Sequence, residues 1–204
     1  MTDMTKLVRL EESRTTEALE ILTDAFAGDP LFKTWGVSRR LITKMFRHPL
    51  MTGFQCGDVF TVNGDLESIM IVTPSDKIQI AFQQFVRNGL LGSVIDILPL
   101  LFKKRTWPLL RALNIIEKDK KTLDIGPYIY LYILAIHQSG QGKGLGSFLM
   151  KTLCQQADKE GKAVYLETQT SENVRFYQKF GFEILKEIPV DNDFSLWEMV
   201  RFAK

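Results

Sequence analysis

Residues 128–136 form an almost wholly apolar run, Tyr-Ile-Tyr-Leu-Tyr-Ile-Leu-Ala-Ile, and a glycine-rich segment follows closely. Such a run is typical of a central strand that is covered on both faces of its sheet. Beyond the glycines, apolar residues recur at helical spacing, at Leu145, Phe148, Leu149 and Leu153. This pattern predicts a helix over about 144–159. The chain is therefore expected to fold around a buried strand, a tight glycine turn and a helix.

The remaining elements predict one mixed α/β unit. Further strands are expected at 6–10, 59–62, 66–72, 163–168, 182–190 and 194–202. Helices are expected at 13–27, with Ser13 as the cap, at 39–50, at 173–179, and in two or three pieces within 75–121. Asn63-Gly64 predicts a hairpin, because both residues of such a turn need a positive φ. At 204 residues the chain is long enough for one sizeable core, so a single domain over 1–204 is expected.

Charge and hydropathy argue against nucleic acid and membrane as partners. The formal net charge is +2, and the densest basic patch, at 103–105, is explained by a solvated helix end. The longest apolar stretch, 89–102, is too short to span a bilayer and contains Asp96 and Pro99. The N-terminal residues lack the apolar region of a signal peptide. Cys56 and Cys154 are isolated from each other, which predicts a reducing cytoplasmic location and no metal site.

The segment that carries chemistry is Gln141-Gly142-Lys143-Gly144-Leu145-Gly146. Glycines let a backbone approach a ligand closely, and free N–H groups at a helix N-terminus attract anions, so the segment is a candidate pyrophosphate cradle. A P-loop is excluded because its lysine must be followed by serine or threonine, whereas Gly144 follows here. A dinucleotide-binding fold is disfavoured because these glycines alternate and lie late in the chain.

A third class fits, since Gln141-x-x-Gly144-x-Gly146 resembles the acyl-CoA pyrophosphate loop of the GNAT superfamily of N-acetyltransferases. The resemblance continues for some fifty residues. Leu134-Ala135-Ile136 resembles the end of that family's splayed fourth strand, and Leu166-Glu167-Thr168 resembles its fifth strand. The run from Asn173 through Phe176-Tyr177 to Gly181-Phe182 resembles its closing signature. Residues 25–30 and the Leu-Glu-Thr strand are most similar to the branch of puromycin N-acetyltransferase.

The resemblance implies an α/β (α+β) GNAT fold with a mixed sheet of about seven strands, helices on both faces, and an extra helical insertion at about 75–121. It also implies acetyl-CoA as cosubstrate. The pyrophosphate would be bound by Gln141, Gly142, Lys143, Gly144, Leu145 and Gly146, and the pantetheine arm by the strand Leu134, Ala135 and Ile136 and by Asn173. Gln141 stands where arginine is commoner, so Lys143 is expected to supply the missing charge.

The expected reaction is direct attack of a neutral amine on the acetyl thioester. An N–H near Ile136 would stabilise the oxyanion, and Tyr177 would hydrogen-bond to the departing thiolate. Glu167 is the candidate base, which burial would have to strengthen. Each role has an alternative. Tyr177 could simply pack on the sheet, Glu167 could be a salt-bridge partner, and Asn173 could be a helix N-cap. His137 could be a base but is more simply a loop residue. Asp29 could attract a cationic amine or begin a turn.

The expected acceptor is a primary amine of a small molecule. The alternatives are acetylation of protein lysines or N-termini, and a non-catalytic acyl-CoA-binding regulatory module. Edge strands expected near the C-terminus would permit a homodimer.

Overall fold

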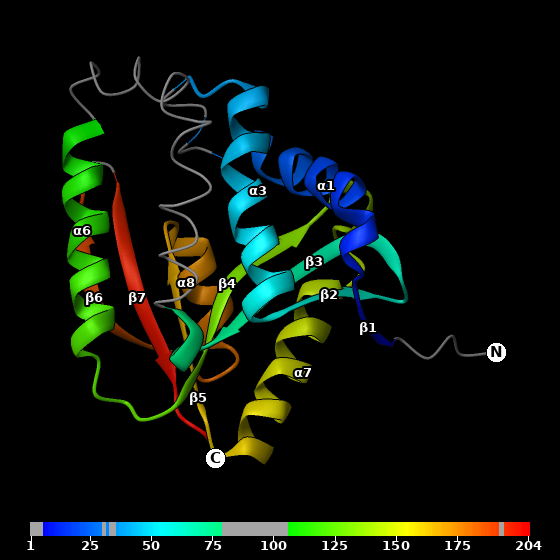
Figure 1. Ribbon diagram of the computed structural model, residues 1–204. Coiled ribbons are helices and arrows are strands. Elements are labelled where there is room, and N and C mark those ends of the chain that lie inside the picture. Colours follow the sequence, from blue (N-terminus) through cyan, green and yellow to red (C-terminus); the bar gives the residue numbers. More distant parts are fainter. Residues whose placement is uncertain (1–5, 30–31, 33–35, 79–105, 192–193) are drawn as a thin grey trace.

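The computed structural model describes residues 6–29, 32, 36–78, 106–191 and 194–204. Seven strands form one mixed sheet in the order β1-β2-β3-β4-β5-β7-β6 (Figure 1). The strands are β1 (Leu7–Arg9), β2 (Asp58–Val62), β3 (Asp65–Pro74), β4 (Tyr128–Ile136), β5 (Ala163–Thr168), β6 (Glu183–Pro189) and β7 (Ser195–Arg201). Only β4 and β5 run parallel to each other, and every other neighbouring pair is antiparallel. The expected mixed sheet of about seven strands is confirmed.

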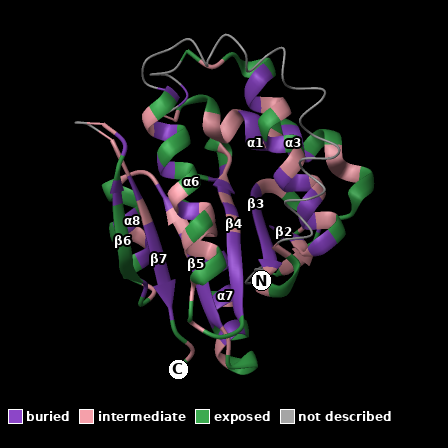
Figure 2. Ribbon diagram, turned by 60° about the vertical axis from the view of Figure 1, so that its left-hand side comes forward, coloured by how far each residue is buried: buried purple, intermediate pink, exposed green. Residues whose placement is uncertain are grey.

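Helices cover both faces of this sheet. They are α1 (Thr15–Ala27), α3 (Arg39–Cys56), α6 (Thr106–Thr122), α7 (Leu145–Glu160) and α8 (Ser171–Gln178), with short 3₁₀ turns at Glu12–Arg14, Ser75–Lys77 and Gln138–Gly140. One face carries α1 and α3 over Ile69, Ile71 and Ile133, and the opposite face carries α7 and α8 over Met70 and Leu131. In Figure 2, α6 lies in front of the sheet and α7 behind it.

The helix α6 shares a face of the sheet with α1 and α3. Its Leu109, Ala112 and Ile116 pack on Ile188 and Leu196 of the last two strands. This helix is the described part of the helical insertion expected at 75–121. The apolar stretch 89–102 and the basic patch 103–105 lie outside the described residues, as do Pro30 and Trp35. Of the helices in the described ranges, none combines the length and apolarity that crossing a bilayer requires.

Local sequence signals explain most element boundaries, and three expectations need correction. Asn63 and Gly64 both have positive φ, 56° and 79°, as the hairpin requires. Ser13 does not cap α1, because its hydroxyl donates to Glu11 within a 3₁₀ turn that precedes the helix. Asn173 is not an N-cap either, since its own N–H donates to the Thr170 hydroxyl, which caps α8.

The third correction concerns α3, which continues six residues beyond the expected end at 50, to Cys56. The continuation is explained by Gly53. A Cβ at this position would lie 2.7 Å from side-chain atoms of Val59 and Ile71, so glycine lets the helix lie directly on the sheet. The buried stripe Leu50, Gly53 and Cys56 continues the apolar face past Pro49.

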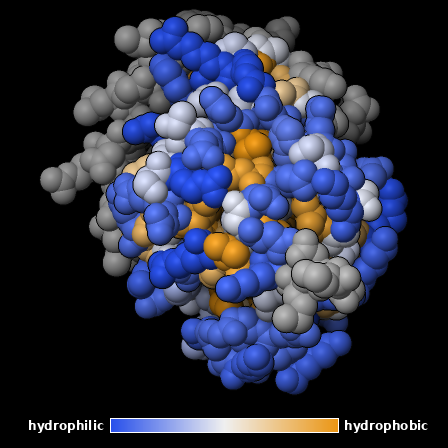
Figure 3. Space-filling model, turned by 90° about the vertical axis from the view of Figure 1, so that its right-hand side faces the viewer, coloured by the Kyte–Doolittle hydropathy of each residue, from blue (hydrophilic) through white to orange (hydrophobic). Residues whose placement is uncertain are grey.

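The surface combines a largely polar covering with some apolar exposure. Figure 3 views the side of the molecule where β1 lies, and apolar atoms there form a central area surrounded by hydrophilic side chains. On the edge strand β6, Ile184 and Leu185 are exposed. The homodimer stays a prediction.

Candidate active site

The strands β4 and β5 part halfway along the sheet. They are paired only at Tyr128–Ala163, Ile129–Val164 and Tyr130–Tyr165. Beyond this point β4 remains paired with β3 up to Ile136, and β5 remains paired with β7 up to Thr168. In Figure 1 the two halves of the sheet diverge, with β4 running to one side and β7 to the other. The parting leaves one edge of each strand without a neighbouring strand.

The backbone of Leu134 and Ile136 faces this parting. The N–H of His137 donates to the carbonyl of Glu67 at 2.8 Å, and the next paired positions are Ile136–Ser68 and Ala135–Ile69. Antiparallel ladders alternate between pairs that exchange hydrogen bonds and pairs that do not. Ala135, like His137, therefore bonds toward β3, and its side chain is buried under α1 and α3. The polar backbone groups of Leu134 and Ile136 point the other way, toward the side that β5 has left.

Two glycines shape the loop that follows β4. Gly142 and Gly144 have φ values of 76° and 77°, the left-handed region that favours glycine, and Gly144 immediately precedes α7. The N–H of Phe148 donates to the carbonyl of Gly144 at 3.0 Å. The N–H groups before it, on the first turn of α7, have no partner within the helix. This end of α7 thus presents backbone donors and a positive dipole end to an anion.

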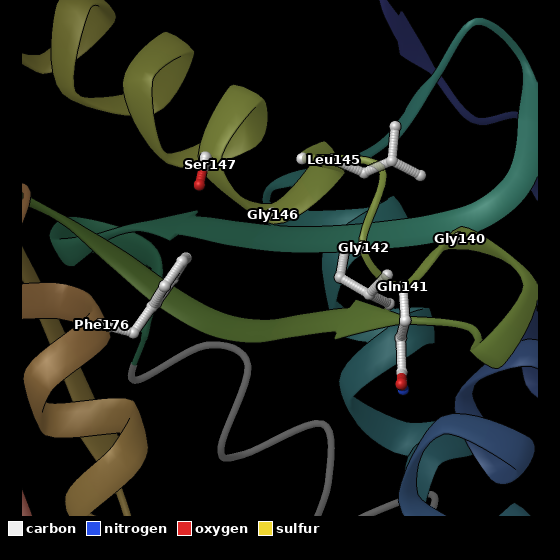
Figure 4. Close-up of a pocket in the computed structure, with 9 residues that line it drawn as sticks. Gly140, Gln141, Gly142, Leu145, Gly146, Ser147 and Phe176 are labelled. Carbon is white, nitrogen blue, oxygen red and sulfur yellow. The ribbon is translucent and has the colours of Figure 1, made fainter.

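A pocket of about 370 Å³ lies between the loop, the start of α7 and α8. Six of the predicted binding residues line it, namely Ile136, Gln141, Gly142, Gly144, Leu145 and Gly146. Figure 4 shows Phe176 extending from α8 as the opposite wall. At Gly146 a Cβ would lie 3.6 Å from Phe176 and 3.7 Å from Ile136, so the absence of a side chain leaves the space between these two walls open.

Sequence reasoning missed three residues that line the pocket, Gly140, Ser147 and Phe176. Gly140 carried a detectable signal, as a glycine next to the loop. A Cβ there would come within 2.9 Å of the Glu67 carbonyl, so no other residue fits without a shift. Phe176 belongs to the recognised Phe-Tyr signature, in which only Tyr177 was given a role.

Lys143 and Asn173 lie apart from the pocket lining. The Lys143 ammonium contacts both carboxylate oxygens of Glu67, at 2.9 and 3.0 Å, and this hydrogen bond lowers the pKa of Glu67. The lysine charge is thus directed at a carboxylate. Asn173 is exposed on the first turn of α8. Gln141 also directs its amide away from the start of α7 (Figure 4).

Tyr177 is buried beside the pocket wall. Its ring lies 5.3 Å from that of Phe176 and 5.7 Å from that of Phe182, measured between centroids, within the core cluster under α7. Burial raises the pKa of Tyr177 well above its usual value, because the phenolate would be poorly solvated. The hydroxyl therefore stays protonated throughout the physiological range and can act as a hydrogen-bond donor.

Glu167 lies on the opposite face of the sheet from Tyr177, under α6. The Tyr130 hydroxyl donates to its Oε2 at 2.6 Å, and Lys120 Nζ lies 3.5 Å from its Oε1. Oε1 is buried and accepts no hydrogen bond from the described residues. Lys120 also contacts Glu117 and lies 5.0 Å from the centre of the Tyr130 ring. The salt-bridge interpretation of Glu167 is confirmed, with a buried lysine that the sequence did not single out.

Two further polar contacts border the site. The Nδ1 atom of His137 lies 2.9 Å from the Ser139 hydroxyl and accepts the Ser139 N–H, so His137 caps the turn as the plain loop reading expected. The amide of Gln169 donates to Asp29 at 2.9 Å. That bond joins the residue after β5 to the end of α1, on the same side of the parted strands as Tyr132.

Known structures share this fold over nearly the whole chain. A structure described as histone acetyltransferase and related acetyltransferase, from Corynebacterium glutamicum, is 18% identical with a TM-score of 0.64, over 98% of this chain and 97% of that one. The arylalkylamine N-acetyltransferase 2 of Aedes aegypti is 16% identical with a TM-score of 0.65, over 99% and 100%. A polyamine N-acetyltransferase of Drosophila melanogaster is 15% identical with a TM-score of 0.58, over 97% and 99%.

Part of the sequence also matches a family model. Residues 113–184 match the acetyltransferase (GNAT) domain, which covers the second half of α6, the parted strands, the glycine loop, α7 and α8. The matched residues thus include the whole pocket lining and both predicted catalytic residues. The chain therefore has the GNAT fold, with a seven-stranded sheet parted between β4 and β5 and a glycine loop at the start of α7, and over residues 113–184 it matches the acetyltransferase (GNAT) domain.

Proposed function

We propose that the chain, as one domain over residues 1–204, transfers the acetyl group of acetyl-CoA to a primary amine of a small molecule by direct attack. The observation that carries the proposal is the continuity of two binding features. The unpaired strand edge at Leu134 and Ile136 leads directly into the glycine loop and the N-terminus of α7. An extended polar arm ending in a pyrophosphate matches that sequence of features.

The loop suits the pyrophosphate through its backbone. The pocket is lined by Gly142, Gly144, Leu145, Gly146 and Ser147, and the positive φ of Gly142 and Gly144 turns the chain around it. Because the Lys143 ammonium contacts Glu67, the proposal assigns phosphate binding to N–H groups and the helix dipole rather than to a side-chain cation. Leu134 and Ile136 would add the pantetheine arm to the sheet like an extra strand. Ala135 and Asn173 have no direct contact in this proposal.

The two predicted catalytic residues flank the parting from opposite faces. An arm that runs back along β4 from the loop leads toward Tyr130 and Tyr165, where β4 and β5 come together. Tyr177, whose ring contacts Phe176 of the pocket wall, would donate a hydrogen bond to the departing thiolate, since burial keeps its hydroxyl protonated. An N–H near Ile136 would stabilise the charge that develops on the carbonyl oxygen. Glu167, on the α6 face, would receive the proton of the acceptor ammonium.

The side chains on the α6 face favour a cationic acceptor with apolar carbon. Tyr130 and Tyr132 stack with ring centroids 5.1 Å apart. Next to them, Glu167 and Glu117 together carry one negative charge more than Lys120, which contacts both. Aromatic rings and carboxylates both attract ammonium groups. Two of the similar structures are described as enzymes of arylalkylamines and polyamines, which supports small amines as acceptors.

Calorimetry followed by an acceptor screen tests the proposal. Purified protein is titrated with acetyl-CoA, ATP and NAD, and thiol release is then followed with arylalkylamines, polyamines and lysine-containing or free N-terminal peptides. Heat from acetyl-CoA alone and thiol release with a small amine are the expected results. Release with peptides only would replace the acceptor class, and binding without any release would favour a regulatory acyl-CoA-binding module. No acetyl-CoA binding near millimolar concentration would overturn the proposal.

A further inference from the structure

A second buried carboxylate lies next to Glu167, on the neighbouring strand and on the same face of the sheet. Glu167 on β5 and Glu198 on β7 are direct partners in the antiparallel ladder, so both side chains lie on the face that α6 covers. Directly opposed residues of such a ladder place their Cβ atoms about 4.5–5.5 Å apart. The Tyr165 hydroxyl donates to Glu198 Oε1 at 3.0 Å, and the Tyr130 hydroxyl donates to Glu167 Oε2 at 2.6 Å. Each carboxylate thus accepts a hydrogen bond from a buried tyrosine.

The other side of Glu167 faces a buried cation. Lys120 reaches down from the last turns of α6 with its side chain only 9% exposed, and its ammonium lies 3.5 Å from Glu167 Oε1. Its neighbours Glu117 and Glu167 raise the pKa of Lys120 above the usual value despite burial, so the lysine stays charged. Glu167 therefore lies between a fixed positive charge and a second carboxylate.

Only one of the two carboxylates adjoins the parted strands. Glu167 is two residues beyond Tyr165, the last residue of β5 that pairs with β4. Its side chain retains 15% exposure, whereas Glu198 is 3% exposed and has the paired strands on both sides. An acceptor amine or a water molecule can thus meet Glu167, while Glu198 and Lys120 can act on the amine only through Glu167.

Neighbouring charges of opposite sign change proton binding in opposite directions. A nearby carboxylate makes a second carboxylate easier to protonate, and a nearby ammonium makes it harder. Burial raises the pKa of Glu198 to about 7, and the Tyr165 hydrogen bond opposes this shift. The charge on Glu198 therefore changes within the neutral pH range.

The surroundings of this pair come from four elements. α6 supplies Glu117, Asp119 and Lys120, β4 supplies the three tyrosines, β5 supplies Tyr165, and β6 supplies Lys186, which pairs with Asp119. The tyrosines have pKa values raised by burial and stay neutral at physiological pH. Asp119 and Lys186 largely offset each other, and Glu117 partly offsets Lys120. The charges of opposite sign that lie next to Glu167 are then Lys120, 3.5 Å from its Oε1, and Glu198, its partner in the ladder.

We propose that Lys120 and Glu198 are positioning residues of opposite sign that together set how readily Glu167 accepts the proton of the acceptor ammonium. The inference rests on the proposed acetyl transfer. An N–H bond of the ammonium breaks and its proton passes to Glu167, directly or through water. The free amine then forms a C–N bond to the acetyl carbon as the C–S bond breaks, a second nitrogen proton ends on the departing thiolate, and Glu167 releases its proton to solvent.

The test compares the directions in which two substitutions shift the pH profile. The pH profile of kcat/KM is measured with the best amine for wild type, Glu198→Gln and Lys120→Met. Glu198 is ionised above about pH 7, and in that range removing the like charge at 198 is expected to move the acid limb to lower pH. Removing the cation at 120 is expected to move the limb to higher pH, each shift being about 1 pH unit. Glu198→Asp and Lys120→Arg keep the charges and should restore the wild-type limb. Lys162→Met, which removes a surface cation paired with Glu160, should leave the profile unchanged.

General structural damage would not shift the acid limbs of the two variants in opposite directions. Shifts of the same sign, or no shift in either variant, would overturn the inference. The same variants are titrated by ¹³C NMR of the glutamate carboxyl carbons, a readout that does not require turnover. Opposite shifts in that titration without acetyl transfer by the wild type would reject the proposed function and leave the charge relationship standing. If Lys120→Met does not fold, Lys120→Gln takes its place in both measurements.

Discussion

Arg201, the last residue of β7, forms a two-pronged ion pair with Asp158 of α7. Its Nη1 and Nη2 atoms donate to Asp158 Oδ1 and Oδ2 respectively, each at 2.8 Å. The backbone N–H of Lys204 donates to the same carboxylate at 2.9 Å. Arg201 is buried and also donates to the carbonyl of Phe180. One carboxylate thus fastens the C-terminal strand to the helix that begins at the glycine loop.

This pair makes stability depend on acid pH. The Arg201 hydrogen bond lowers the pKa of Asp158 to about 2, below the usual value. Because the folded state holds the carboxylate ionised, the contribution is fully present above about pH 4 and is lost as the pH falls toward 2. In Asp158→Asn we expect a lower Tm at pH 7 and a smaller further decrease between pH 4 and 2. Thermal melts across that range measure both, and equal pH dependence in the two proteins would contradict the assignment.

Substituting the glycine at the start of α7 is expected to weaken acetyl-CoA binding, whereas substituting the glycine at its end is not. Gly144 and Gly161 both adopt positive φ, 77° and 62°, with open space where a Cβ would be. Alanine costs about 1–2 kcal/mol of backbone strain at either position. Gly144→Ala should weaken acetyl-CoA binding at least tenfold in calorimetry, and Gly161→Ala should leave it unchanged at a similar loss of Tm. Equal affinities in the two variants would count against the loop as the binding site.

Gly146 offers a substitution in which stability and binding should diverge. It lies within the first turn of α7 without a positive φ, so alanine should stabilise the helix by about 0.5–1 kcal/mol. The new methyl group would project between Phe176 and Ile136, 3.6 and 3.7 Å from their side chains. We expect Gly146→Ala to raise the Tm slightly and to weaken acetyl-CoA binding. A variant that binds as tightly as wild type would show that the ligand does not pass between these walls.

Tyr177→Phe separates the chemical role of the hydroxyl from ring packing. Phenylalanine keeps the contacts with Phe176 and Phe182, so the Tm and the KM for acetyl-CoA should change little. Loss of the hydrogen bond to the thiolate should lower kcat about 100-fold. Because burial raises the pKa of Tyr177, wild-type kcat should show no loss below about pH 10 from its ionisation. An unchanged kcat in the variant would reduce Tyr177 to a packing residue.

The fold could be predicted from local patterns because its central elements carry strong ones. The run at 128–136 and the strand at 163–168 have the same bounds in the structure, and Asn63-Gly64 forms the expected turn. Element ends were less predictable where tertiary packing decides them, as at Gly53, where a close approach to the sheet keeps α3 helical. The puromycin branch stays a prediction, and residue 30 of its motif lies outside the described ranges.

The site was predictable where function depends on the backbone and unpredictable where it depends on distant side chains. Glycine spacing located the loop correctly. The Lys143–Glu67 contact spans 76 positions and the Lys120–Glu167 contact joins α6 to β5, so no local signal indicated either. Lys120 stands in the segment expected to be a helical insertion, although it reaches the residue proposed as the base.

The parting between β4 and β5 also concerns the mechanics of the molecule. Three paired positions are all that β4 and β5 share, and β5 is the strand through which β7 and β6 join the rest of the sheet. A cosubstrate arm bonded to Leu134 and Ile136 would occupy the seam between the two halves. Its departure as free CoA would then loosen the same seam, so the rigidity of the sheet would change during the catalytic cycle.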